Sequence, residues 1–155
     1  MFDILNAITE QIAAKFKNPI YIDNLPQDFI RPSFYVELLN STDTDMTSGL
    51  QERQMAFQIT YFGKQDEYAV VSTSELYAVW MILEKLFYRS LYINKEDYKK
   101  ISSIEHFIKD GLLITTLRLD FSYGIQQDNP LTPEEVYDLI REINIKYNNR
   151  LDLIN

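Results

Sequence analysis

The stretch Ile104–Phe121, IEHFIKDGLLITTLRLDF, decides the fold. At its centre, Asp110-Gly111 is a two-residue turn signal between two apolar runs, and it predicts a β-hairpin. Counting outward from this turn places His106 opposite Thr115. Alternation then gives the hairpin one inward face, made of Ile104, His106, Ile108, Leu113, Thr115, Leu117, Leu119 and Phe121.

Further elements lie on both sides of this hairpin. Helical spacing of apolar residues predicts amphipathic helices over 2–17, 72–88 and 133–147. Period-two alternation predicts strands over 33–40 and 51–62. The order is therefore α-β-β-α-β-β-α. We expect residues 1–155 to form a single α+β domain, with three helices on a mainly antiparallel sheet of four to five strands.

The last helix has strong end signals. Thr132 is a good N-cap, Pro133 suits the first helical position and Glu135 completes a capping box. Asn148-Asn149 is expected to end this helix, leaving residues 149–155 as a C-terminal tail. That tail contains Leu151, Leu153 and Ile154, and an apolar tail of this kind is a candidate docking segment.

Residues 41–50 are polar and lack periodicity, so we expect a long loop that makes contacts with a partner. Asp43 and Asp45 resemble the start of a calcium loop. That pattern also requires glycine at the sixth position and glutamate at the twelfth, which are Ser48 and Gln54 here. The interpretation as an interaction loop is therefore kept.

The composition excludes several classes of function. A net charge of −8 is unfavourable for a protein that grips nucleic acid through its phosphates. With no cysteine, the chain has no disulfide, thiolate metal site or cysteine nucleophile. The N-terminus lacks the basic region of a signal peptide, and no apolar run reaches membrane-spanning length. These features predict a soluble protein that does not enter a membrane.

Candidate catalytic groups are few. His106 is the only histidine, and its inward position beside Thr115 favours a structural role. The four glycines are isolated, so no phosphate-cradling or dinucleotide pattern is present. Around Lys95–Lys100, acids lie among the lysines, which favours a solvated connection over a phosphate site. We therefore expect no enzyme activity, metal site or cofactor. The helix over 72–88 is apolar on more than one side, including at Met81, which indicates a protein partner.

A family resemblance extends over most of the chain. The opening helix, Ile20–Ile22, Arg31–Val36 and Gln54–Phe62 together resemble the small tail terminator proteins of tailed phages. The similarity is greatest to those of Gram-positive phages, prophages and phage-tail-like bacteriocins. It implies a structural virion protein that forms a hexameric ring, caps the tail tube, ends its polymerisation and provides the head–tail joining surface.

The resemblance also implies partners and a location. They are further copies of the chain, the tail tube protein and a head–tail connector or neck protein, with the sheath as a further candidate. DNA would pass through the lumen without specific binding, repelled by Asp43 and Asp45. The protein would reside in the tail or neck of a virion assembled in the host cytoplasm. The segment implied to face the lumen or tube is Thr42, Asp43, Thr44, Asp45, Met46, Thr47, Ser48 and Gly49.

Other functions stay open at this point. A head–tail completion or neck adaptor protein would have a similar size and also form rings. A small cytoplasmic enzyme could use carboxylates or tyrosine hydroxyls in a pocket. A small adaptor could bind one partner by strand addition.

Overall fold

The computed structural model describes residues 2–124 and 132–154, with side chains described up to residue 144. The chain divides into two compact units, Met1–Gly124 and Ile125–Asn155. The first unit contains a sheet and two helices, and the second contains the helix α3 (Pro133–Ile154). The prediction that residues 1–155 form one domain stays a prediction.

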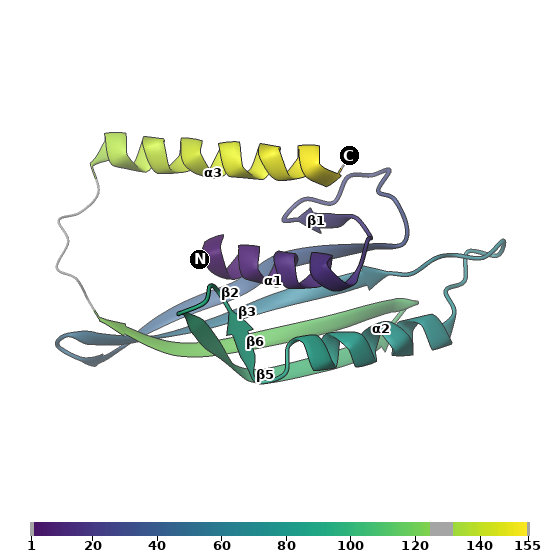
Figure 1. The fold of residues 1–155 in the computed structure, drawn as a ribbon, viewed down its shortest axis with the longest axis horizontal. Coiled ribbons are helices and arrows are strands. Elements are labelled where there is room, and N and C mark those ends of the chain that lie inside the picture. Colours follow the sequence, from purple (N-terminus) through teal and green to yellow (C-terminus); the bar gives the residue numbers. More distant parts are fainter. Residues whose placement is uncertain (1, 125–131, 155) are drawn as a thin grey trace. The chain divides into compact units, whose positions relative to one another are not determined.

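A six-stranded sheet in the order β1-β2-β3-β6-β5-β4 is the basis of the first unit (Figure 1). Its strands are β1 (Ile20–Ile22), β2 (Ser33–Thr47), β3 (Leu50–Phe62), β4 (Ser90–Tyr92), β5 (Tyr98–Lys109) and β6 (Leu112–Gly124). Every pair is antiparallel except β1–β2, which is parallel. The α+β class is confirmed, but the predicted strand number is too low. The additional strands β1 and β4 have three residues each, too few to show alternation.

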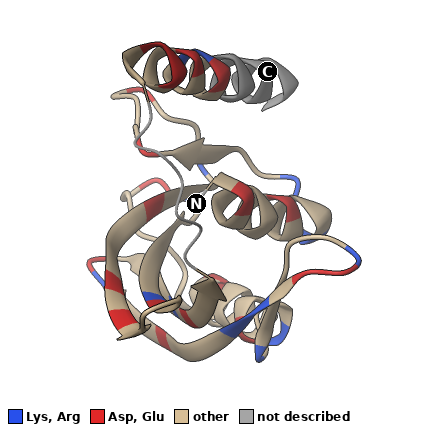
Figure 2. Cartoon of the chain, turned by 90° about the vertical axis from the view of Figure 1, so that its left-hand side faces the viewer, with Lys and Arg blue, Asp and Glu red and all other residues tan. Residues whose placement is uncertain are grey.

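Two helices cover one face of this sheet. Figure 2 shows the sheet curving around α1 (Phe2–Lys15) and α2 (Thr73–Leu86), which contact each other. The largest fully buried side chains come from both helices, from β2, β3, β4 and β6, and from the residue directly after α2. They are Ile8, Ile12, Phe34, Phe57, Phe87, Ile59, Leu76, Leu83, Leu91, Leu113, Leu117 and Leu119. This single core fixes which face of each strand points inward. Among the described helices, none has an apolar stretch long enough to cross a membrane.

The β5–β6 hairpin confirms the register predicted from Asp110-Gly111. His106 pairs with Thr115, and Lys109 pairs with Leu112 directly beside the turn. Both turn residues have positive φ, 53° at Asp110 and 74° at Gly111, as a two-residue hairpin turn of this kind requires. The sequence signal and the backbone therefore agree at this position.

The expected loop over residues 41–50 is wrong. β2 continues to Thr47 and pairs with β3 from Leu50, so only Ser48 and Gly49 form the turn. The strand has polar side chains on both faces, and such a strand shows no alternation of hydrophobic and polar residues. It is stabilised through cross-strand pairs with β3, which β6 flanks on its other side.

The N-terminus of α3 forms the predicted capping box. The backbone N–H of Thr132 donates to Glu135 Oε2 at 2.7 Å, and the N–H of Glu135 donates to Thr132 Oγ1 at 3.3 Å. The first of these bonds lowers the pKa of Glu135. The predicted helix end at Asn148-Asn149 is wrong, because α3 continues to Ile154. Asparagine is only mildly unfavourable inside a helix, and neither glycine nor proline follows it.

Candidate functional site: the hairpin arm and the sheet edges

Three strands extend past the N-terminus of α1 at one end of the unit (Figure 1). We call this extension the arm and define it as residues 40–54 and 120–124. Every β2 side chain in it is exposed, so its β2 part has no contact with the hydrophobic core, whereas Phe121 on β6 packs against that core. A sheet segment without a core depends on its ladder hydrogen bonds and on side-chain pairs across its strands.

A side-chain network joins all three strands of the arm. Arg53 on β3 forms two hydrogen bonds with the carboxylate of Asp43 on β2, at 2.6 and 2.8 Å. Arg53 Nη2 also donates to the hydroxyl of Tyr123 on β6 at 3.1 Å, and its guanidinium lies 4.7 Å from that ring centre. The Tyr123 hydroxyl donates to Gln51, which in turn donates to Asp45 at 2.6 Å.

This network changes the role expected for Asp43. Its hydrogen bond with Arg53 lowers the pKa of the Asp43 carboxyl, so the group stays ionised, but the cation beside it cancels its charge. The expectation that Asp43 and Asp45 repel DNA stays a prediction, and at Asp43 the nearby guanidinium offsets the charge. Asp45, Glu52 and Asp120 are the arm acids that have no ion-pair partner among the described residues.

Two irregularities in β2 expose apolar side chains. The pairing with β3 shifts register between Leu38 and Asn40 and again between Asp45 and Thr47. The residues without a cross-strand partner are Leu39 and Met46, whose exposed fractions are 45% and 54%. Bulges commonly re-aim a side chain at a sheet edge. Here they give the outer strand two apolar contact points.

The outer edge of β2 is open along most of its length. β1 pairs only with Phe34–Val36, and the backbone N–H of Asp23 then donates to Val36 O. Among the described residues, no backbone group bonds to this edge over Glu37–Thr47. That segment contains neither lysine nor proline, the residues that commonly protect an edge strand from pairing.

The opposite side of the sheet has a second open edge. β4 pairs only with Tyr98–Lys100 of β5, and the N–H of Ile101 donates to Arg89 O. From Ser102 to Lys109, no described strand lies beyond β5. Phe107 is 47% exposed within this second edge. The sheet can therefore be extended on both sides.

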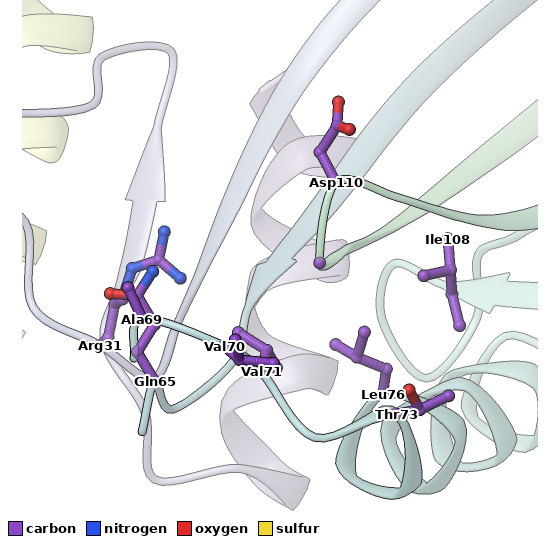
Figure 3. Close-up of a pocket in the computed structure, with 10 residues that line it drawn as sticks. Arg31, Gln65, Ala69, Val70, Val71, Thr73, Leu76, Ile108 and Asp110 are labelled. Carbon is purple, nitrogen blue, oxygen red and sulfur yellow. The ribbon is translucent and has the colours of Figure 1, made fainter. Parts of the chain in front are cut away.

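A pocket of about 400 Å³ lies at the end of the unit opposite the arm. Three apolar residues line it, namely Val71, Leu76 and Ile108 (Figure 3). Asp110, at the turn of the β5–β6 hairpin, also lines it. Arg31 also lines it and is held 5.3 Å from the Phe62 ring centre. The pocket suits an apolar side chain better than a reaction, because it offers no acid–base pair beside a nucleophile.

His106 has the structural environment expected from the sequence. Its Nδ1 lies 2.8 Å from Thr115 Oγ1, and its ring stacks on Trp80 with ring centres 5.1 Å apart. Burial lowers the pKa of His106, although the nearby Glu84 carboxylate opposes that shift. Glu84 is on α2, so a search limited to the hairpin face missed it. The buried Nε2 has no hydrogen-bond partner among the described residues.

The predicted interaction residues belong to three different elements. Thr42–Thr47 lie in β2, and Ser48 and Gly49 form its turn. Met81 is on α2 and is 58% exposed. Leu151, Leu153 and Ile154 lie in the last turns of α3, where side chains are not described. The predicted tail over 149–155 is therefore helical up to Ile154, and Asn155 lies outside the described residues.

Sequence reasoning missed the most informative features of the arm. Leu39 gave no signal by itself, because a bulge becomes visible only when the register with β3 is known. A two-residue turn at Ser48-Gly49 would by itself set Asp43 opposite Gln54. The ion pair of Asp43 with Arg53 also depends on the register shift at Met46, which the sequence does not reveal.

Among the described residues, no three histidine, cysteine, aspartate or glutamate side chains gather as metal ligands. The first unit is thus a small α+β body whose exposed arm and two open edges offer surfaces for contact with other chains. A family model for the phage tail terminator protein matches residues 3–130. The chain therefore belongs to the phage tail terminator family, a structural family of phage tails, and the resemblance seen in the sequence is confirmed. No curated protein matches the chain.

Proposed function

We propose that this protein is the tail terminator of a phage or phage-tail-like particle. Copies of the chain form a hexameric ring that caps the tail tube, ends its polymerisation and provides the surface for joining the head. The family match over residues 3–130 carries the proposal, because it includes both helices and all six strands of the first unit. It also favours a terminator over a separate neck adaptor.

A closed ring requires one patch of each copy to bind a different patch of the next copy. The first unit offers such patches on opposite sides, namely the open edges of β2 and β5. The exposed face of α2 around Met81 is a further contact, and the end of α3 around Leu151, Leu153 and Ile154 is another. A contact of this type produces a ring when the rotation from each copy to the next adds up to a full turn.

The arm turn, Thr42–Gly49, faces the lumen or the end of the tube in this proposal. The Arg53 network supports that role, because it holds the arm extended before any partner binds. A preformed arm loses less conformational entropy on binding than a flexible loop would. Met46 supplies an apolar contact near its end.

Partners of the ring are the tube protein on one face and a connector or neck protein on the other, with the sheath as a further candidate. DNA passes through the lumen without specific binding. The net charge of −8 supports this passage, because a negative surface repels phosphates and releases no counterions. Asp45, Glu52 and Asp120 are the arm acids best suited to that task, because Arg53 offsets the charge of Asp43.

Mixing the purified chain with tube protein tests the proposal. We expect the chain alone to have the mass of a discrete ring, and tubes polymerised in its presence to be shorter and to carry a cap at one end. Tube length is measured by negative-stain electron microscopy. A chain that stays monomeric and leaves tube length unchanged contradicts the proposal.

A pair of variants tests the arm separately. Met46→Asp places a charge near the arm turn, and we expect it to weaken capping while leaving the ring mass unchanged. Ser74→Asp is the matched control, because Ser74 is an exposed residue near the start of α2 and does not line the pocket. Equal capping by both variants contradicts a role for the arm turn.

A further inference from the structure

We propose that β2 of one copy adds to β5 of the next, so that a continuous β-sheet closes the ring. This inference rests on the ring in the proposed function and names the surface that builds it. The occupant of each open edge is therefore a second copy of this chain. Strand addition supplies affinity through main-chain hydrogen bonds and specificity through the side chains beside them.

Strand direction permits the contact. Within one sheet, β2–β3, β3–β6 and β6–β5 are all antiparallel, so β2 and β5 run in opposite directions. When copies are related by rotation about an axis roughly parallel to the strands, β2 of one copy lies antiparallel to β5 of its neighbour. The sheet then continues across the boundary in the pattern it already has.

The charges of the two edges favour β5 of a second copy over β2 of a second copy. Over Glu37–Thr47 the charged residues are three acids, of which Arg53 neutralises Asp43. The open part of β5, Ser102–Lys109, has one glutamate and one lysine and therefore no net charge. Two acidic β2 edges repel each other, whereas β2 meets no net negative charge on β5.

Each of the two open edges also exposes an apolar side chain. Leu39 projects from the bulge in β2, and Phe107 lies exposed on β5. Phe107 pairs with Ile114 on the face of the sheet that the helices do not cover. A leucine and a phenylalanine at facing edges bury apolar area when the copies meet, and aromatic–aliphatic cross-strand pairs are favourable.

A matched pair of lysine variants tests whether self-association depends on the edge strand β2 or on the arm in general. Thr42 and Gln54 are cross-strand partners and both exposed, but only Thr42 is on the edge strand. Thr42→Lys places on the open edge a residue that protects edge strands from pairing, and we expect self-association to weaken about tenfold. Gln54→Lys adds the same charge and should leave self-association within about twofold of the unmodified chain. Equal weakening by both variants overturns the edge contact.

Cysteine pairs give the decisive test, because the chain has no cysteine of its own. Glu105→Cys on β5 is combined in turn with Glu37→Cys, Asn40→Cys, Thr42→Cys or Thr44→Cys on β2. These β2 positions sample successive registers on one sheet face. Directly opposed residues bring their Cβ atoms within reach of a disulfide. We expect one or two neighbouring registers to give, on oxidation, a ladder of covalent oligomers that ends at the ring.

The outcomes separate this contact from the ring itself. A ring by mass with no cross-linked register overturns the β2–β5 contact and leaves the terminator proposal standing. A covalent dimer from Thr42→Cys alone means that β2 pairs with β2, which also overturns it. Cross-links that form only to added tube protein assign the edge to the tube instead. A chain that forms no oligomer contradicts the proposed function as well.

Discussion

The guanidinium of Arg53 on β3 and the carboxylate of Asp43 on β2 form two hydrogen bonds, at 2.6 and 2.8 Å. The pair is solvent-exposed, and exposed ion pairs contribute little to global stability. Its geometry is nevertheless bidentate, and Tyr123 joins it from β6. The pair therefore matters for the local order of the arm rather than for the core.

Replacing Arg53 tests that local role. Arg53→Lys keeps the charge but loses the bidentate geometry, so we expect faster amide hydrogen exchange over residues 41–47. The Tm should change by no more than about 4 °C, because the core is untouched. Arg118→Lys is the control, since Arg118 is exposed on β6 outside the arm. Unchanged exchange in the Arg53 variant would show that the ladder alone orders the arm.

Acid should loosen the arm through the same pair. The pKa of Asp43 is lowered in the folded chain, so the unfolded arm takes up a proton more readily than the folded one. The contribution of the pair is therefore present above the ordinary aspartate pKa of about 3.9 and is lost as pH falls below it. Exchange measured through this range should rise earlier over 41–47 than in the β5–β6 hairpin. A simultaneous rise in both contradicts the prediction.

The single histidine should titrate below its ordinary range. Burial lowers the pKa of His106, so protonation favours the unfolded chain. Stability is highest above the unfolded pKa of about 6.5 and declines as pH falls below it. An NMR titration of the one imidazole signal gives the pKa directly. A measured pKa at or above 6.5 contradicts the burial argument. In the His106→Gln variant, the difference in Tm between pH 7.5 and pH 5.5 should be smaller than in the unmodified chain.

Replacing Phe34 by alanine should destabilise the protein far more than replacing Phe107. Phe34 is fully buried and lies between the rings of Phe16 and Tyr61, with ring centres 4.8 and 4.9 Å away. Phe34→Ala should lower the free energy of unfolding by about 3–5 kcal/mol in urea melts. Phe107→Ala removes a half-exposed ring, and its cost should stay near 1 kcal/mol. Similar costs at both positions would contradict the assigned core.

Two glycines provide a matched test of packing. A Cβ at Gly63 would overlap Val71 Cγ1, whereas a Cβ at Gly49 would have no atom within 4 Å. In Gly63→Ala the Val71 side chain must move, and we expect a cost of about 1–3 kcal/mol. Gly49→Ala in the arm turn should stay within about 0.5 kcal/mol. The urea midpoint of each variant checks the pair, and equal costs would contradict the packing around the pocket.

The core hairpin could be predicted because its chemistry is local. Asp110-Gly111 can take the required positive φ values, and alternation outward from it fixes the register down to His106 and Thr115. The capping box at Thr132 was predictable for the same reason. Signals of this kind depend on neighbours in sequence, which a single chain displays directly.

The arm could not be predicted in the same way. Its strands have polar side chains on both faces, so the alternation that marks a half-buried strand is missing. Arg53 and Tyr123 stabilise it from other strands, and Tyr123 is far from Asp43 in sequence. The end of α3 was misplaced because Asn148-Asn149 resembles a stop that the following residues do not support. These errors arise where tertiary contacts or weak propensities decide the structure.

Electron microscopy of tail tubes polymerised with and without this protein can decide whether the protein terminates tails. We expect shorter tubes that each carry a ring-shaped cap at one end, together with a discrete ring in the absence of tube protein. Tubes of unchanged length with bare ends, beside a protein that stays monomeric, would contradict it.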